Sequence, residues 1–362
     1  MTDLVTVLKT AVASGASDIH IAVNKPPMMR RNGEMIPVLD TMPVLTAEDT
    51  KVLIYSALHD EQKAKFEANW ELDCSFAITG ISRFRLNVLV ARNGVEAVMR
   101  VIPSIIPTPE QLNLGPTITN LSTLHKGLVL VTGPTGSGKS TTLAAILDLI
   151  NQKKKGHMLT IEDPIEFTYE AKSCVIRQRE IGQHTKSFGN ALRAALREDP
   201  NVILVGEMRD LETIQLTITA AETGHLSFAT LHTQDAPSTV DRIIDVFPPH
   251  QQTQVRVQLA SSLQAVVSQI LLPRKDGKGR VAAREIMIMT PAISNLIREG
   301  KTHMIYSAIE TGAKVGMVPM DKALVNLVKQ NLVAYDIAEA KAHDRESFRT
   351  LCGMMSAQPA AH

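Results

Sequence analysis

The sequence has few cysteines, few aromatic side chains and almost no net charge. Its three cysteines, Cys74, Cys174 and Cys352, are far apart and odd in number, so they form neither a disulfide framework nor a CxxC zinc pattern. Aromatic residues make up 4% of the chain, and 38 basic residues balance 37 acidic ones. This composition argues against a protein that wraps nucleic acid, although it allows a local basic channel.

Long hydrophobic runs are also absent. No segment approaches the ~18 uninterrupted apolar residues of a membrane-spanning helix. The N-terminal stretch MTDLVTVLKTAVASG lacks a basic region before an apolar core, so it is not a signal peptide. We therefore expect a cytoplasmic protein in a reducing compartment, which would reach a membrane only through a partner. With 362 residues, 44% of them hydrophobic, the chain is long enough for two or three domains with sizeable cores.

Residues 1–102 predict a small α+β domain. Apolar residues at helical spacing predict helices over 2–14 and 47–68. Alternating patterns and turn signals predict strands over 17–23, 71–78, 81–91 and 95–102. A proline-rich stretch, 103–116, follows and is expected to be a linker, because it can continue neither a helix nor a central strand.

Two arginines of this first domain are candidate ligands of phosphate. If Asn93-Gly94 forms a two-residue turn, Arg100 lies opposite Asn87 and diagonal to Arg85 on one face of the sheet. Like charges so placed repel unless an anion or carboxylates lie between them, and guanidinium groups suit phosphate well. A phosphate clamp is therefore one interpretation, and pairing with acids such as Glu71 or Asp73 is the other.

Residues 117–355 predict an α/β domain with a parallel sheet covered by helices, followed by a loose tail at 356–362. Short apolar runs predict strands at 127–131, 158–161, 202–205 and 227–231. A hairpin is expected at 266–289, and helices are expected at 291–300 and 320–332.

The strongest signal in the sequence is a phosphate-binding loop between a predicted strand and a predicted helix. It satisfies the pattern G-x-x-x-x-G-K-[ST] in full, with Lys139 expected to reach the β- and γ-phosphates and Ser140 expected to bind Mg²⁺. The glycines let backbone N–H groups face an anion at a helix N-terminus. The candidate nucleotide-binding residues are Gly133, Pro134, Thr135, Gly136, Ser137, Gly138, Lys139, Ser140 and Thr141.

Carboxylates follow two of the predicted parallel strands. Glu207, after the strand 202–205, is a candidate to hold Mg²⁺ through a water or to place the attacking water, with an ion pair to Arg209 as the alternative. Three acids lie in the segment Glu162-Asp163-Pro164-Ile165-Glu166, after the strand 158–161. Either Glu162 or Glu166 could orient and deprotonate the water, and the spacing alone does not choose between them.

Two histidines flank the predicted strand 227–231. His225 and His232 are seven residues apart on an extended segment, so they face opposite ways about 23 Å apart and cannot share one zinc ion. Either of them could sense the γ-phosphate, or simply satisfy a strand end.

Four segments together resemble the type II/IV secretion ATPases. They are GPTGSGKSTT (133–142), TIEDPIEF (160–167), REDPNVILVGEMRD (197–210) and TGHLSFATLHT (223–233), which look like the Walker-A, Asp, Walker-B and His boxes of that family. The segments GASDIHI, RFRLNVL, RVIPS and RIIDVFPPHQQ resemble the pilus retraction ATPases in particular. The resemblance runs over nearly the whole chain.

The resemblance implies a PAS-like N-terminal domain, a RecA-like P-loop ATPase domain and a homohexameric ring that hydrolyses ATP with Mg²⁺. It implies a motor at the inner face of the inner membrane, where a platform protein connects it to pilin. By position in the boxes, the catalytic glutamate falls on Glu166, the Walker-B glutamate on Glu207 and the nucleotide-contacting histidine on His232. The arginines of the N-terminal domain fall on Arg85 and Arg100.

One motif departs from the retraction ATPases. They often carry AIRNLIRE, whereas this chain has AISNLIRE at 292–299, with Ser294 in place of the arginine. Extension ATPases are longer and carry a tetracysteine zinc segment, which this chain lacks. Retraction is therefore the leading interpretation, with an accessory or extension ATPase of the same family, or a RecA-like nucleic-acid translocase, as alternatives.

Overall fold

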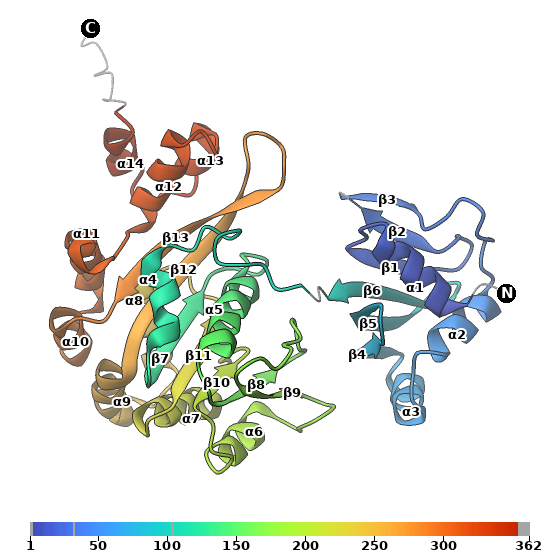
Figure 1. Cartoon of the computed structure of the whole chain (residues 1–362), viewed down its shortest axis with the longest axis horizontal. Helices are drawn as coiled ribbons and strands as arrows, with labels where there is room; N and C mark the ends of the chain where they lie inside the picture. The colour runs from blue at the N-terminus through green and yellow to red at the C-terminus, as the bar shows by residue number, and fades with distance from the viewer. Residues whose placement is uncertain (1–2, 32, 103–104, 354–362) are drawn as a thin grey trace, which may run out of the picture. The chain divides into compact units, whose positions relative to one another are not determined.

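The computed structural model describes residues 3–31, 33–102 and 105–353 (Figure 1). The chain divides into two compact units, Met1–Ile105 and Ile106–His362, each with its own sheet. The division falls inside the proline-rich stretch that we expected to be a linker. Pro103 and Ser104 of that stretch, and the tail expected at 356–362, lie outside the described residues.

The first unit has a six-stranded antiparallel sheet in the order β3-β2-β1-β6-β5-β4. Apolar side chains such as Leu8, Ile19, Phe84 and Met99 are fully buried between this sheet and the helices. The strands are β1 (Asp18–Ile21), β2 (Met28–Arg31), β3 (Glu34–Pro37), β4 (Glu71–Ile78), β5 (Ser82–Ala91) and β6 (Gly94–Ile102). The helices are α1 (Leu4–Ala13), α2 (Ala47–Tyr55) and α3 (Asp60–Asn69).

The single helix predicted over 47–68 is wrong, because the chain forms two helices there. The hydroxyl of Ser56 donates to the carbonyl of Leu53, and Leu58 turns into the core. His59 is extended, and its backbone N–H donates to the side chain of Gln62 at the start of α3. These local hydrogen bonds satisfy the groups that a continuous helix would have used, so the break costs little.

The predicted turn between the last two strands is displaced by one residue. Ala91 pairs with Gly94, so the turn is Arg92-Asn93, and Arg100 lies directly opposite Arg85 rather than opposite Asn87. Gly94 belongs to β6, where an added Cβ would come 3.1 Å from the Cβ of Ala47 on α2. The glycine therefore serves close packing and not the turn. The two arginines remain on one face of the sheet and are nearer to each other than predicted.

The second unit has a seven-stranded sheet in the order β13-β12-β7-β11-β10-β8-β9. The four predicted strands are parallel neighbours, and the predicted hairpin adds β12 and β13 at one edge. The strand at the other edge, β9, was not predicted. The strands are β7 (Gly127–Thr132), β8 (His157–Glu162), β9 (Val175–Glu180), β10 (Val202–Val205), β11 (Leu226–Leu231), β12 (Leu263–Pro273) and β13 (Arg280–Ile288).

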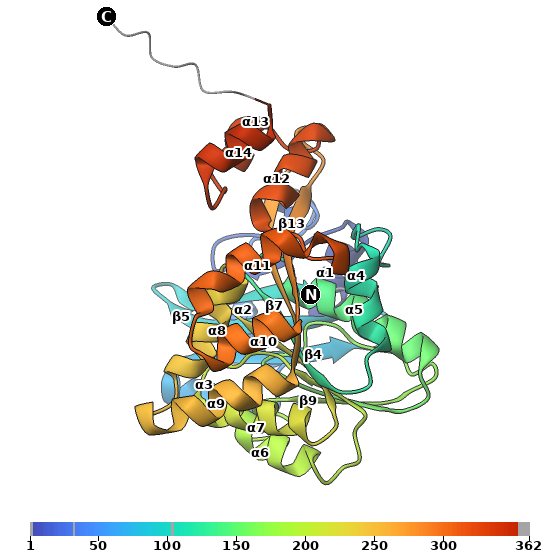
Figure 2. The same cartoon turned by 90° about the vertical axis from the view of Figure 1, so that its left-hand side faces the viewer.

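Helices cover both faces of this sheet (Figures 1 and 2). Along β7, Leu128 and Leu130 pack with α6–α11, whereas Val129 and Val131 pack with α4 and α5. The helices are α4 (Pro116–Thr119), α5 (Lys139–Lys153), α6 (Phe188–Ala195), α7 (Leu211–Glu222), α8 (Ala236–Asp245), α9 (Pro249–Ser262), α10 (Pro291–Arg298), α11 (Ile305–Thr311), α12 (Met320–Lys329), α13 (Tyr335–Glu339) and α14 (Arg345–Leu351). Across the part of the chain that the structure describes, no helix has the length and apolar character to cross a bilayer.

The parallel sheet determines where the candidate residues gather. The carboxyl ends of parallel strands meet at one edge, and in an α/β sheet this edge carries the ligand site. The phosphate-binding loop follows β7, Glu162 ends β8, Glu207 follows β10 and His232 follows β11. The sequence boxes are therefore brought together by strand order and not by proximity in the chain.

Candidate nucleotide-binding site

The phosphate-binding loop lies between β7 and the first turn of α5, as the sequence predicts. Gly133 has a φ of +139° and Gly138 a φ of +85°, conformations that favour glycine. A Cβ at Gly133 would lie 2.2 Å from the backbone oxygen of Gln269. Pro134, Thr135 and Gly136 form the exposed tip of the loop, and Ser140 and Thr141 lie half-buried in the first turn of α5.

The polar groups of the loop fit a phosphate chain. The Nζ atom of Lys139 donates to the carbonyls of Gly133 at 2.8 Å and Pro134 at 3.2 Å. Burial lowers the pKa of this lysine, although the negative charges of Glu207 and Glu166 raise it in part. The hydroxyl of Ser137 is buried without a hydrogen-bond partner among the described residues. Phosphate oxygens could accept hydrogen bonds from both the ammonium group of Lys139 and the hydroxyl of Ser137, which has no partner in the described structure.

The neighbouring strand β12 supports the loop through a residue that sequence reasoning missed. Gln269 is 1% exposed, and its Nε2 donates to the backbone oxygen of Ser137 at 2.7 Å. Its Oε1 accepts from the hydroxyl of Thr142 at 2.9 Å. Gln269 therefore connects the loop and α5 to the sheet. The signal was available, since a glutamine within a mostly apolar strand needs buried partners.

The carboxylate of Glu207 has two partners, Arg209 and His232. Its Oε2 accepts from Arg209 at 2.7 Å, and its Oε1 lies 3.1 Å from Nε2 of His232. Burial raises the pKa of Glu207, but the hydrogen bond and charge of Arg209, together with His232, outweigh burial and leave the pKa below its ordinary value. The Arg209 pair considered from the sequence is present, and the structure adds His232, which comes from the neighbouring strand.

The two glutamates of the Asp box have different environments. Glu162 is 6% exposed, and its carboxylate accepts from the hydroxyl of Thr160 at 2.7 Å and from the backbone N–H of Glu166 at 3.2 Å. Burial raises the pKa of Glu162 to about 7. The side chain of Glu166 is exposed. The carboxylate of Glu162 is committed to holding the segment, which favours Glu166 as the group that meets a water.

His225 takes a local role at the other end of β11. Its Nδ1 lies 3.2 Å from the hydroxyl of Thr223 and 3.0 Å from the backbone oxygen of Ala220. The two histidines thus contact different groups, as the spacing predicts. Within residues 3–31, 33–102 and 105–353, no cluster of three or more histidine, cysteine and acidic side chains could hold a metal ion.

The arginine pair of the first unit lies on neighbouring strands. Arg100 donates from Nε to Asp18 on β1 at 2.9 Å, and its side chain is still 69% exposed. Burial raises the pKa of Asp18, but polar contacts outweigh burial and leave this pKa below its ordinary value. The hydrogen bond from Arg100 is the largest of these contacts. The acids expected as alternative partners were Glu71 and Asp73, whereas Arg100 pairs with Asp18. Arg85, directly opposite, is exposed.

The sequence profile of the family described as "Type II/IV secretion system protein" matches residues 1–331. The chain belongs to this family. It is 51% identical, over 96% of its length and 100% of the relative, to the "Type IV pilus retractation ATPase PilT" of Pseudomonas aeruginosa. It is 39% identical, over 98% of its length and 92% of the relative, to the "Type IV pilus ATPase PilU" of the same organism.

A solved structure of a family member covers almost the same chain. The crystal structure of the pilus retraction motor PilT with bound ADP superimposes with a TM-score of 0.90 at 46% identity, over 96% of this chain and 99% of that chain. This match confirms the expected fold class, a RecA-like P-loop domain of α/β type preceded by a small PAS-like α+β domain. The family and the ADP-bound relative support nucleotide binding by this chain, and the loop at 133–140 is the candidate site for it.

Proposed function

We propose that this chain is the ATP-hydrolysing motor that retracts type IV pili. The observation that carries the proposal is the 51% identity to a pilus retraction ATPase over the whole of that protein. A "Twitching motility protein" of Neisseria gonorrhoeae is 50% identical over 89% of this chain and 85% of that protein. The intact phosphate-binding loop, with acids after β8 and β10, supports hydrolysis rather than nucleotide binding alone.

Each candidate residue of the second unit has a separate proposed role in binding the nucleotide and Mg²⁺. Backbone N–H groups of the loop bind the phosphates, Lys139 reaches the β- and γ-phosphates, and Ser140 offers its hydroxyl to Mg²⁺. Glu207 would hold Mg²⁺, and its contacts with Arg209 and His232 favour the ionised carboxylate that this role needs. When bound, Mg²⁺ neutralises the charge that develops on the phosphates.

Glu166 and the arginine pair complete the proposed catalytic set. Glu166 orients the attacking water and accepts its proton, a role that its exposed carboxylate can take. Arg85 and Arg100 supply positive charge to the phosphates, since paired guanidinium groups bind phosphate oxygens in a defined geometry. In Arg100, the ion pair with Asp18 leaves most of the side chain exposed.

The proposed assembly is a homohexamer at the cytoplasmic face of the inner membrane. There it would act on a membrane platform protein and, through it, on pilin. An accessory motor is the second candidate, because the chain carries Ser294 where retraction motors often have arginine. Ser294 is buried in α10, and its hydroxyl donates to the backbone oxygen of Ala260 in α9 at 3.1 Å, so the serine is part of the packing.

Deletion of the gene, scored for surface pili and twitching, distinguishes these functions. Excess immobile pili would support retraction, absent pili would indicate assembly, and unchanged cells would indicate an accessory motor. Complementation with the wild-type chain and with Lys139→Ala then tests the motor itself. We expect that only the wild-type chain restores twitching, because the variant lacks the ammonium group that reaches the β- and γ-phosphates.

A further inference from the structure

The segment that carries Glu166 has little structure of its own. Between the end of β8 at Glu162 and the start of β9 at Val175, the backbone forms neither helix nor strand. Buried backbone N–H and C=O groups need partners, and here side chains of the flanking elements provide them. The position of Glu166 therefore depends on these side chains.

Gln178 of β9 provides the contacts that follow Glu166. Its Nε2 donates to the backbone oxygen of Phe167 at 2.8 Å, and its Oε1 accepts from the backbone N–H of Tyr169 at 2.9 Å. One side-chain amide thus satisfies two backbone groups of the residues that come just after the proposed catalytic glutamate.

The same amide also reaches the residue that holds Glu166 from the other side. Nε2 of Gln178 lies 3.4 Å from Oε1 of Glu162, whose Oε2 accepts from the backbone N–H of Glu166 at 3.2 Å. Gln178 is therefore linked to the Glu166 backbone in two ways. It binds the backbone of residues that follow Glu166 in the chain, and it contacts Glu162, whose carboxylate binds the backbone N–H of Glu166.

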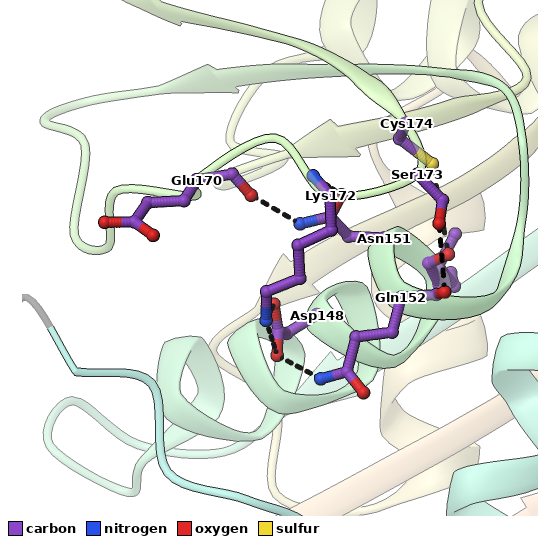
Figure 3. Close-up of polar contacts among 8 residues, drawn as sticks. Asp148, Asn151, Gln152, Glu170, Lys172, Ser173 and Cys174 are labelled. Carbon is purple, nitrogen blue, oxygen red and sulfur yellow. Dashed lines mark hydrogen bonds and ion pairs between the residues drawn. The ribbon is translucent and has the colours of Figure 1, made fainter.

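The two ends of the segment are held independently of Gln178. Ile165 donates from its backbone to Glu180 at 3.1 Å. Asn151 of α5, fully buried, donates to the backbone oxygen of Glu170 at 2.7 Å and accepts from the backbone N–H of Lys172 at 3.0 Å (Figure 3). Loss of the Gln178 contacts should thus loosen the middle of the segment without detaching it from the fold.

We infer that Gln178 is a positioning residue for Glu166. The inference rests on the proposed catalytic role of Glu166. Among the described residues, the side chain of Gln178 forms hydrogen bonds with Phe167, Tyr169 and Glu162 and none with the phosphate-binding loop. We therefore expect it to act on the placement of the water-activating carboxylate and not on nucleotide affinity. A displacement of about 1 Å at a reacting group can cost on the order of 100-fold in rate.

The test is Gln178→Met in the full-length protein, assayed for steady-state ATP turnover and for binding of a fluorescent ATP analogue. Methionine keeps the length and volume of glutamine but forms neither backbone contact. We expect kcat to fall by at least ~10-fold, with KM and analogue affinity changed by less than about 2-fold. A kcat within about 2-fold of wild type, or a parallel loss of affinity, would overturn the inference.

The matched control is Gln152→Met. Gln152 lies exposed on α5, and its side chain contacts the carboxylate of Asp148 and not the backbone of the segment (Figure 3). Its kcat should stay near that of the wild type. If Gln178→Met does not fold, Gln178→Glu replaces it, since glutamate keeps the acceptor for Tyr169 and loses the donor to Phe167. The same kcat loss is then expected.

A double variant separates this inference from the proposed role of Glu166. If Gln178 acts through Glu166, adding Gln178→Met to Glu166→Gln should change kcat by less than about 2-fold, because the group being positioned is already disabled. A full additional loss would mean that Gln178 acts elsewhere and would refute the inference alone. Retained turnover in Glu166→Gln would instead remove the proposed role of Glu166 and the inference with it.

Discussion

The buried carboxyl group of Glu285 on β13 makes the stability of the second unit depend on pH. Glu285 is fully buried, and its Oε1 accepts from the backbone N–H of Ala236 at the start of α8, at 2.8 Å. Burial, with help from the nearby charges of Asp235 and Asp321, raises its pKa from 4.5 to about 7. Glu285 therefore keeps its proton in the folded chain over a range where it has lost it in the unfolded chain.

The sign of the effect follows from this difference in bound protons. Between pH 4.5 and 7 the folded chain binds more protons at this site, so the free energy of unfolding falls as pH rises. With about 1.4 kcal/mol for each tenfold difference in proton affinity, Glu285 alone removes about 3 kcal/mol of stability between pH 4 and pH 8. Above about pH 8 little further change is expected from it, because Glu285 is then ionised in both the folded and the unfolded chain.

The perturbation is Glu285→Gln, which has the same shape and no titrating proton. The stability of the variant relative to the wild type should rise by about 3 kcal/mol between pH 4 and pH 8. Urea unfolding followed by circular dichroism is the suitable assay, because the single tryptophan, Trp70, lies in the first unit and would not report on the second. Glu61→Gln, on the exposed surface of α3, is the control for loss of one carboxylate. A difference between variant and wild type that stays constant with pH would refute the reasoning.

Three further predictions concern the nucleotide. Lys139→Ala and Glu207→Ala should each lower phosphate release by at least ~100-fold, the scale seen when one electrostatic stabiliser is removed, and near-normal turnover in either would contradict its assigned role. Arg85→Ala and Arg100→Ala should lose turnover but keep most ATP affinity in equilibrium binding, whereas unchanged rates would leave them as surface charges. Gly133→Ala should abolish binding of an ATP analogue while the far-ultraviolet spectrum is retained, because the added Cβ meets a backbone oxygen at 2.2 Å and displaces the loop. Wild-type affinity in that variant would show that the loop tolerates a side chain.

The structure corrected the sequence predictions where tertiary packing overruled a local signal. Asn93-Gly94 looks like a hairpin turn, yet the glycine is required where β6 passes α2, so the turn lies one residue earlier. The strand β9 was missed because its sequence, VIRQRE, has apolar side chains only at its first two positions and shows no apolar alternation. Its importance comes from Gln178, whose partners lie in a neighbouring loop.

The sequence by itself determined the phosphate-binding loop, the apolar parallel strands and the acids that follow them. These are local properties, because glycine conformations, strand patterning and residue spacing depend on residues that are close together in the sequence. Only the tertiary structure decided which side chains act on each other. It brought His232 to Glu207, Asp18 to Arg100 and Gln178 to the Glu166 segment, because strand order places residues side by side that are distant in the chain.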